Sequence, residues 1–409
     1  MDIVSLINQV EVIDSHIAEN HFAGFDVYDV WDNGLFHALL RCRVKLLRKM
    51  IRFVLSWSVF LCPGVILKVS KKEKTINAKA MGLILKAYCN AYATLKDDKY
   101  LSKAESVASW LLENPSQGYS GLCWGYPFGW SSTIFIPKNT PSSVVSTVVG
   151  DGLYSLYGIT KDVKYLNACK GICDFILHDL HIDRIDDDTI CFSYTPMDFN
   201  HVHNANLFCS EFLIRIGKEC SINEYISDGM RAANFYLREI NSDGSNAYWA
   251  LRDRHHSKYS RNVNDHYHTG FEIRCLCRIA DVLGEDRYFD AFRKRYEYYL
   301  KEYVASPRIY MYPQKNYPLN IHAASEAILC NSMVMQMLGN KEDWIDDIVA
   351  WINKEFLDED GLYLFEKRKL GPLTLNCKFK YLRWGQAWMF LALSEYMKLW
   401  SKCEEDYRH

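Results

Sequence analysis

The stretch Asp97-Asp98-Lys99-Tyr100-Leu101 decides the fold, because its pattern returns four more times along the chain. The further copies are Lys164-Tyr165-Leu166, Glu224-Tyr225-Ile226, Arg287-Tyr288-Phe289 and Asp343-Trp344-Ile345. An acidic residue at or before each aromatic residue is a helix start signal, and an apolar helical run follows. The aromatic positions lie 56 to 65 residues apart, which leaves room for two helices and two loops per step.

A repeated helical hairpin of this length predicts a ring. Five hairpin starts are visible, and the apolar runs Leu35–Leu47 and Ile76–Ala93 supply the remaining helices. We therefore predict an all-α (α/α)6 toroid of six inner and six outer helices, in which closure removes the unpaired ends of an open solenoid. Without a linker rich in Pro, Gly or Ser, residues 1–409 are interpreted as one domain, with residues 1–75 contributing N-terminal helices.

The two kinds of connection differ in length and chemistry. Loops into the repeated helices are short and carry glycine at a helix end, as in Gly158 and Gly217. Loops out of them are long and polar, and alternating pieces such as 242–249 and 358–364 predict short β-hairpins there. Because the topology alternates, all the long loops must emerge on one face, and we expect the functional site on that face.

Composition excludes several classes of protein. A net charge of −2 gives no basic footprint for nucleic acid. The fourteen cysteines are scattered through apolar helical runs, which favours buried thiols and a reducing cytoplasm over a disulfide scaffold. No phosphate-binding glycine loop occurs, and the two histidines of 266–268 diverge at a helix start, so neither a cofactor nor a metal is predicted.

The segment 53–67 is apolar between clusters of Lys and Arg. It is shorter than the roughly 20 residues of a spanning helix, and Pro63-Gly64 interrupts it. We interpret it first as a buried helix followed by a turn. The alternative is a peripheral contact of its basic flanks with a membrane or with membrane-bound machinery.

The long loops and the helix starts behind them carry the candidate substrate-binding residues. Aromatic side chains suit the C–H faces of sugar rings, and amides, cations and carboxylates suit their hydroxyl and acidic groups. The candidates are Trp124, Tyr126, Tyr194, Asn204, Asn206, Arg261, His322, Glu326, Arg383, Trp384 and Gln386.

Two reactions compete for the candidate catalytic residues. Glycosidic bond cleavage needs a pair of carboxylates, for which Asp198 and Asp265 come from neighbouring hairpins. Uronate β-elimination or C5 epimerisation needs a proton-abstracting base instead, for which the sequence offers tyrosine and the histidines His203, His266 and His268.

Several motifs together resemble a known group of proteins. They are Cys123-Trp124-Gly125-Tyr126-Pro127-Phe128, Ser193-Tyr194-Thr195-Pro196, His203-Asn204-Ala205-Asn206, Asp265-His266-Tyr267-His268-Thr269-Gly270-Phe271 and Arg383-Trp384. Over roughly residues 24–399 the chain looks like the six-hairpin glycosidase-like proteins of bacterial capsule and exopolysaccharide biosynthesis clusters. The resemblance implies an oligosaccharide or polysaccharide partner, and a pocket lined by Asp265 and residues 266–268.

The sequence therefore predicts a cytoplasmic protein that acts on a bacterial surface polysaccharide or its precursor, by glycosidic bond cleavage. The alternatives are a uronate-directed lyase or C5-epimerase, and a non-catalytic sugar-binding or scaffold subunit of a polysaccharide biosynthesis assembly.

Overall fold

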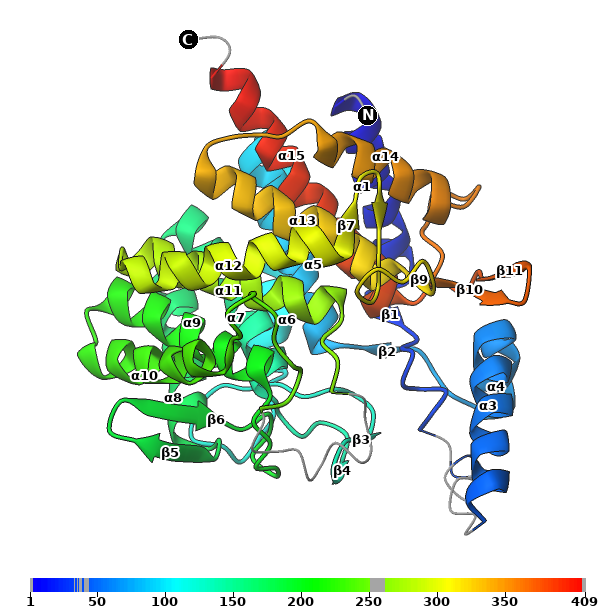
Figure 1. Cartoon of the computed structure of the whole chain (residues 1–409). Helices are drawn as coiled ribbons and strands as arrows, with labels where there is room; N and C mark the ends of the chain where they lie inside the picture. Colours follow the sequence, from blue (N-terminus) through cyan, green and yellow to red (C-terminus); the bar gives the residue numbers. More distant parts are fainter. Residues whose placement is uncertain are drawn as a thin grey trace.

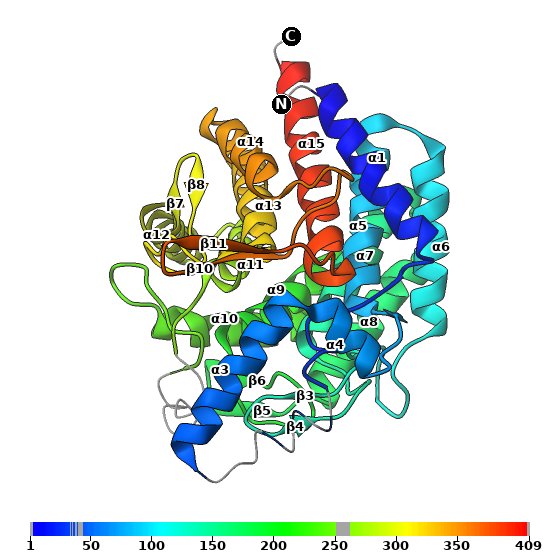
Figure 2. The same cartoon turned by 90° about the vertical axis from the view of Figure 1, so that its right-hand side faces the viewer.

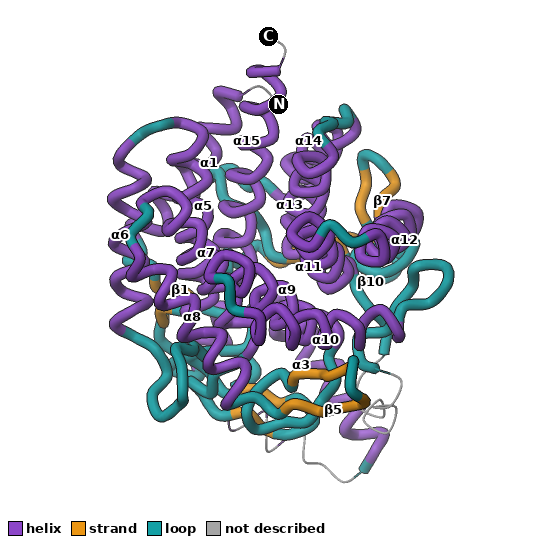
Figure 3. Tube along the Cα trace, turned by 90° about the vertical axis from the view of Figure 1, so that its left-hand side faces the viewer, coloured by secondary structure: helices purple, strands orange, loops and turns teal. Residues whose placement is uncertain are grey.

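The computed structural model describes residues 3–32, 44–250 and 262–406, together with Gly34, Phe36 and Leu39. Within these residues helices make up most of the molecule, and strands form only short pieces between them (Figure 3). Much of the predicted run 35–47, and Arg261 among the candidate binding residues, lie outside the described residues.

Six helices form a closed inner ring. Each contacts the next in chain order, and the last contacts the first. They are α5 (Ala78–Leu95), α7 (Ser143–Thr160), α9 (His203–Cys220), α11 (His266–Leu283), α13 (Ile321–Leu338) and α15 (Trp388–Asp406). The π-helical turn η3 (Leu382–Ala387) leads into the last of them.

Each inner helix packs against one outer helix. The outer helices are α6 (Asp98–Glu113), α8 (Val163–His178), α10 (Asn223–Glu239), α12 (Asp286–Tyr303), α14 (Trp344–Phe356) and α1 (Ile3–Glu19). The N-terminal α1 packs on the C-terminal α15, and both helices lie in the upper part of the molecule in Figure 1. This arrangement is the predicted (α/α)6 toroid.

The repeated sequence stretches start outer helices, as predicted. Asp97 and Asp162 accept the backbone N–H of Lys99 and Lys164 and so cap α6 and α8. The aromatic residue behind each cap, Tyr100 or Tyr165, is buried against the core. These aromatic residues therefore pack the outer helices α6 and α8 against the inner ring.

Buried ion pairs fill the axis of the ring. Asp151 of α7 pairs with Lys86 of α5, Arg215 of α9 and Arg278 of α11. The Asp151 oxygens lie 2.9 Å from Arg215 Nη1 and 3.3 Å from Arg278 Nη2. Although burial opposes ionisation, these three cations hold the pKa of Asp151 well below its usual range.

The long loops carry short antiparallel strands. They are β1 (Ala23–Gly24) with β2 (Thr75–Ile76), β3 (Trp130–Ser131) with β4 (Phe135–Ile136), β5 (Ile182–Asp186) with β6 (Thr189–Phe192), β7 (Val304–Ala305) with β8 (Arg308–Ile309), and a sheet of β9 (Leu319–Asn320), β10 (Glu366–Leu370) and β11 (Leu373–Cys377). The β-hairpins predicted at 242–249 and 358–364 are confirmed in part: an antiparallel bridge between Leu357 and Tyr363 closes the second, whereas Trp249 of the first pairs with Val202. Both stretches hold turns and single bridges, and the last β-hairpin begins at Glu366.

Helices α3 (Lys45–Leu61) and α4 (Pro63–Val69) stand beside the ring rather than in it, at the right in Figure 1 and in front of the ring in Figure 2. The first interpretation of 53–67 as a buried helix is wrong, because Phe53 and Val65 are 61% and 62% exposed. The described residues cover one side of α3, where Arg368 of β10 lies over the Phe60 ring. Among the described helices none alone meets the length and hydropathy of a membrane span, but α3 and α4 meet them jointly, across a bend of 102°.

Candidate functional site

A cavity opens where the inner helices begin. Its volume of about 130 Å³ has room for roughly ten water molecules. The first residues of all six inner helices contribute to its wall or stand directly behind it, as Lys79 does on α5 and His322 on α13. The positive ends of the inner helix dipoles are thus directed towards the cavity.

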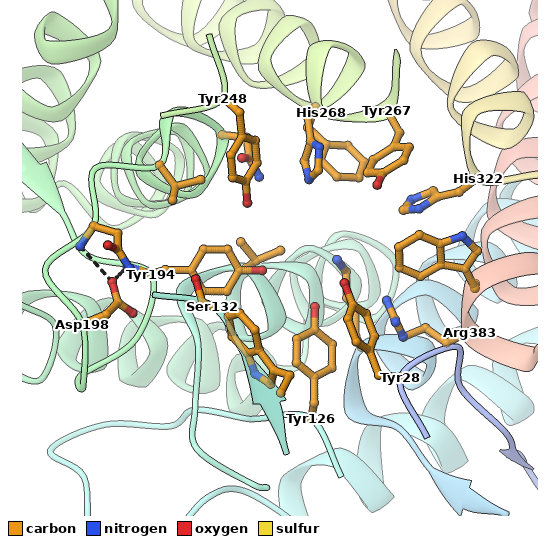
Figure 4. A pocket seen from close by; sticks show the side chains of 18 of the residues that line it. Tyr28, Tyr126, Ser132, Tyr194, Asp198, Tyr248, Tyr267, His268, His322 and Arg383 are labelled. Carbon is orange, nitrogen blue, oxygen red and sulfur yellow. Dashed lines mark hydrogen bonds between the residues drawn. The ribbon is translucent and has the colours of Figure 1, made fainter. Parts of the chain in front are cut away.

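Aromatic rings form most of the wall (Figure 4). The aromatic lining residues are Tyr28, Tyr126, Phe128, Trp130, Tyr194, Tyr248, Trp249, Tyr267, Phe271 and Trp384. Burial raises the pKa of Tyr194 and Tyr267 well above the ordinary value, so their phenols stay protonated near neutral pH. The wall therefore offers flat apolar faces with hydroxyl donors and acceptors between them, which suits a sugar ring.

His268 is held by a carboxylate. Asp265 is the N-cap of α11, and its Oδ1 accepts the backbone N–H of His268 at 3.0 Å. The same oxygen lies 2.9 Å from Nδ1 of the His268 ring. When Nδ1–H donates to this carboxylate, the lone pair is fixed on Nε2. Asp265 itself does not line the cavity.

His322 lies in the first turn of α13 and has no polar partner for its ring. It is 2% exposed, and neither ring nitrogen forms a hydrogen bond with any described residue. The ring stacks on Tyr267 with a centroid distance of 4.2 Å and packs against Trp384 and Trp388. Burial, assisted by the charges of Lys79 and Arg383, lowers the pKa of His322 well below the ordinary value. The imidazole is therefore neutral at pH 7 and free to bind a ligand.

Two cations lie at the same end of the cavity. Arg383 is paired through Nε and Nη2 with the Asp26 carboxylate and lies against the rings of Tyr126 and Trp384. Lys79 has its amine 5.7 Å from the Phe271 ring centroid and 5.5 Å from that of Trp388.

Asp198 is the one carboxylate among the described lining residues, and its own loop occupies both its oxygens. Oδ2 accepts the amide and the hydroxyl of Thr195 at 2.8 and 2.6 Å. Oδ1 accepts the amides of Tyr194 and Asn200 at 3.3 and 3.0 Å. Asp198 therefore holds the loop that presents Tyr194, and Figure 4 shows two of these bonds.

The structure brings half of the sixteen predicted site residues into the cavity wall. These eight are Tyr126, Tyr194, Asp198, Asn204, His268, His322, Arg383 and Trp384. They share one feature: each lies in a long loop or in the first turn of an inner helix or of η3.

Two histidines proposed as catalytic have structural hydrogen bonds instead. His203 Nδ1 lies 2.7 Å from the carbonyl oxygen of Ala247. His266 is fully buried between the Tyr310 carbonyl and the Tyr299 hydroxyl, each at 2.8 Å, and burial lowers its pKa to about 4. Neither lines the cavity, because these partners hold both rings inside the wall.

The remaining predicted residues that miss the cavity are also used by the fold. The Trp124 indole donates to the Leu111 carbonyl at 3.0 Å. Other such contacts join Asn206 to Phe192 and Ala232, Glu326 to Arg274, and Gln386 to the backbone of Tyr363. These side chains satisfy buried polar groups and leave no atom for a substrate.

Sequence reasoning missed Lys79 and Tyr28. Lys79 did carry a signal, since it follows the cap Asn77 in the first turn of an otherwise apolar helix. A cation is disfavoured at that end by the helix dipole, so a lysine there needs another reason. Tyr28 lies in the irregular segment after β1, where no periodic pattern identified it.

The sequence matches no protein-family model and no curated protein. Solved structures share the fold at low identity. The GH76 α-mannanase from Bacteroides thetaiotaomicron has a TM-score of 0.58 at 13% identity, over 83% of this chain and 89% of that one. A family 105 glycoside hydrolase from C. acetobutylicum scores 0.56 at 15% identity, over 78% and 93%. Cellobiose 2-epimerase from Bacillus thermoamylovorans scores 0.56 at 13% identity, over 78% and 87%.

Proposed function

We propose that this protein is a carbohydrate-active enzyme in which His268 and His322 move a proton at a carbon atom of a sugar. One observation carries the proposal: the cavity wall holds two imidazoles, one fixed by a carboxylate and the other without a hydrogen-bond partner among the described residues. They lie in the first turns of successive inner helices, on the same side of the cavity as Tyr267 (Figure 4).

The chemistry follows from the state of each group. A C–H bond next to a carbonyl or carboxylate can be deprotonated when a nearby base takes the proton and donors stabilise the charge on oxygen. The neutral His322 is suited to act as the base. The imidazole of His268, oriented by Asp265, returns a proton, and the protonated phenols of Tyr194 and Tyr267 stabilise the oxygen. The net result is epimerisation or isomerisation.

The fold supports a sugar as the substrate. Structures with the same toroid include an α-mannanase and a cellobiose 2-epimerase, by their names. The aromatic wall is consistent with a sugar ring lying flat on it.

Glycosidic bond cleavage is the second candidate, because two of these similar structures are glycoside hydrolases. That reaction needs two carboxyl groups across the scissile bond. Asp198 is the single carboxylate among the described lining residues, and four hydrogen bonds from its own loop occupy it. The histidine pair is therefore the better-supported machinery.

The test uses solvent deuterium. The protein is incubated in D2O with aldoses, disaccharides and uronates, and exchange at carbon is followed by NMR. We expect His268→Asn and His322→Asn each to lower the exchange rate roughly 10²- to 10⁴-fold. The exposed His178 on α8 provides the matched control, and His178→Asn should leave the rate unchanged.

Products heavier by one water would instead establish a hydrolase, above all if Asp198→Asn abolished them. Sugar binding without exchange or cleavage, in the wild type and in every variant, would favour a non-catalytic subunit. Both outcomes would overturn the histidine-based proposal.

We further propose a bacterial surface polysaccharide, or its precursor, as the natural source of the sugar. The support is the resemblance of the motifs around Tyr126, Tyr194 and His268 to proteins of capsule and exopolysaccharide clusters. Capsular oligosaccharides offered as substrates should show exchange, or the ultraviolet chromophore of an unsaturated uronate if the reaction proceeds to elimination. Activity confined to free monosaccharides would contradict this extension.

The exposed face of α3 supports a peripheral contact with an anionic membrane. Apolar side chains recur at helical spacing at Leu46, Met50, Phe53 and Leu61, each more than half exposed. The basic residues Lys45, Lys49 and Arg52 flank this stripe. A helix of this kind lies in the interface, with its cations on anionic headgroups.

A vesicle assay tests the membrane contact. The protein should co-sediment with vesicles containing phosphatidylglycerol and not with pure phosphatidylcholine, and Phe53→Glu should abolish binding. The control is Val163→Glu, which places the same charge at an exposed apolar position on α8. Equal binding by Phe53→Glu and wild type would refute the contact.

We also propose that residues 1–409 fold as one domain. Closure of the ring needs both ends of the chain, because α1 packs on α15 and α15 on α5. A single thermal transition is expected, and two separate transitions would contradict it.

A further inference from the structure

Lys79 is a buried cation for which the fold provides no counterion. The residue is 4% exposed, and its amine forms no hydrogen bond or ion pair with any of the residues that the structure describes. Its close neighbours are the rings of Phe271 and Trp388. Lysine is rarely buried without a partner, because removing its charge from water is costly.

The neighbouring carboxylates are already neutralised. Asp26 holds Arg383 in a two-pronged pair, with Oδ1 at 2.7 Å from Nη2. Glu326 holds Arg274 in the same way, at 2.6 and 3.2 Å. Each of these two carboxylates is therefore neutralised by one guanidinium, and neither is available as a counterion for Lys79.

The electrostatic consequence is visible in the groups around the amine. Burial, reinforced by Arg383, lowers the pKa of Lys79 well below its ordinary value. After burial, Lys79 and Arg383 are also the leading causes of the lowered pKa of His322. The N-terminus of α5 adds the positive end of a helix dipole at the same place. This corner of the cavity has a positive potential, and the part of the chain that the structure describes places no unpaired carboxylate beside the amine to balance it.

We propose that Lys79 binds an anionic group of the substrate, so that the ligand is an acidic sugar that carries a carboxylate or a phosphate. The inference rests on the proposed function only in taking the ligand to be a sugar. The anion supplies the missing counterion, and its binding favours the protonated form of the amine. Arg383 is beside it but already paired, so it contributes potential rather than the main contact. The rings of Phe271 and Trp388 exclude water and strengthen the ion pair.

Thermal shift measurements on the full chain test the inference at constant ionic strength. D-Glucuronate, D-galacturonate and D-mannuronate are the carboxylate probes, and D-glucose 6-phosphate is the phosphate probe. D-Glucose, D-galactose and D-mannose are their neutral counterparts. We expect at least one anionic probe to raise the Tm of the wild type at concentrations where its neutral counterpart does not. The uronate and phosphate arms identify which anion the site takes.

The key variant is Lys79→Met, which keeps the length of the side chain and removes its charge. It should lose the anion-specific shift and, without ligand, should melt no lower than wild type, since it removes an unpaired buried amine. Lys86→Met, on the same helix, is the contrasting variant. Lys86 is paired with Asp151 away from the cavity wall, so its loss should lower the Tm but preserve the anion-specific shift.

Two results would overturn the inference: no anionic probe stabilises the wild type beyond its neutral counterpart, or Lys79→Met keeps the preference. Neither result decides the proposed function, because deuterium exchange into a neutral sugar by the histidines would still support that function. Conversely, anion binding through Lys79 without exchange would sustain this inference while the proposed reaction failed.

Discussion

Replacing Asp265 by Asn separates two tasks that this side chain performs. Its Oδ1 caps α11 by accepting the His268 amide at 3.0 Å, and the same atom lies 2.9 Å from the ring nitrogen Nδ1 of His268. Asparagine caps helices about as well as aspartate, so Asp265→Asn should change the free energy of unfolding by no more than about 1 kcal/mol. The substitution does remove the negative charge that faces the imidazole.

The loss of kcat/KM expected for Asp265→Asn follows from the strength of the hydrogen bond between Asp265 and the His268 ring. A hydrogen bond to a charged group contributes about 1.5–3 kcal/mol, against about 0.5–1.5 kcal/mol for a neutral one. The difference of about 1–2 kcal/mol corresponds to a roughly 5- to 30-fold lower kcat/KM.

The assay is deuterium exchange across a pH series, with chemical denaturation of the same preparations. Asp162→Asn is the matched control, because Asp162 also caps a helix, α8, but pairs with Lys164 rather than with a residue of the cavity wall. It should share the small change in stability and show no change in exchange. The reasoning fails if Asp265→Asn keeps the wild-type rate, since Asp265 would then be only a helix cap.

Three further predictions concern the stability of the ring. Asp151→Asn leaves three buried cations without their shared carboxylate and should lower the free energy of unfolding by about 3–5 kcal/mol; a loss below 1 kcal/mol by urea titration would refute the axial network as described. Gly270→Ala places a Cβ 2.4 Å from Cγ of Glu326 on the next inner helix. Although alanine has the better helix propensity, the substitution should lower the free energy of unfolding by about 1–3 kcal/mol. Unchanged urea unfolding would show that α13 can shift to accommodate the methyl group. The pKa of His266 is about 4 in the folded protein, against 6.5 for an unperturbed histidine, so the unfolded chain takes up the proton first as the pH falls. The contribution of neutral His266 to the free energy of unfolding is therefore complete above about pH 7.5 and falls by about 2 kcal/mol at pH 5. His266→Gln should lack this drop when both proteins are unfolded with urea at the two pH values.

The aromatic repeat by itself predicts the fold. The five aromatic helix starts, with their acidic residues, identify outer helices by local rules alone, since a cap and an apolar stripe act within a few residues. Alternation of short and long loops likewise placed the site at the start of the inner helices, where Tyr126, His268 and Arg383 are found.

What the sequence could not decide was the direction and pairing of each polar side chain. His203, His266 and Glu326 look like site residues because they lie in the first turns of inner helices, but each turns towards a partner inside the wall. Those partners, Ala247, Tyr310 and Arg274, are between 44 and 52 residues away in sequence, so no local pattern reveals them.

The same reason explains why Lys79 went unnoticed and α3 was misjudged. The sequence neighbours of a lysine in an apolar helix do not reveal whether a carboxylate from another helix of the ring will pair with it. An apolar stripe predicts that a helix buries one face but not what covers that face. Local sequence therefore determined the elements and the face on which they meet, whereas the tertiary structure decided which charges are balanced and which surfaces are left uncovered, because both depend on segments far apart in the chain.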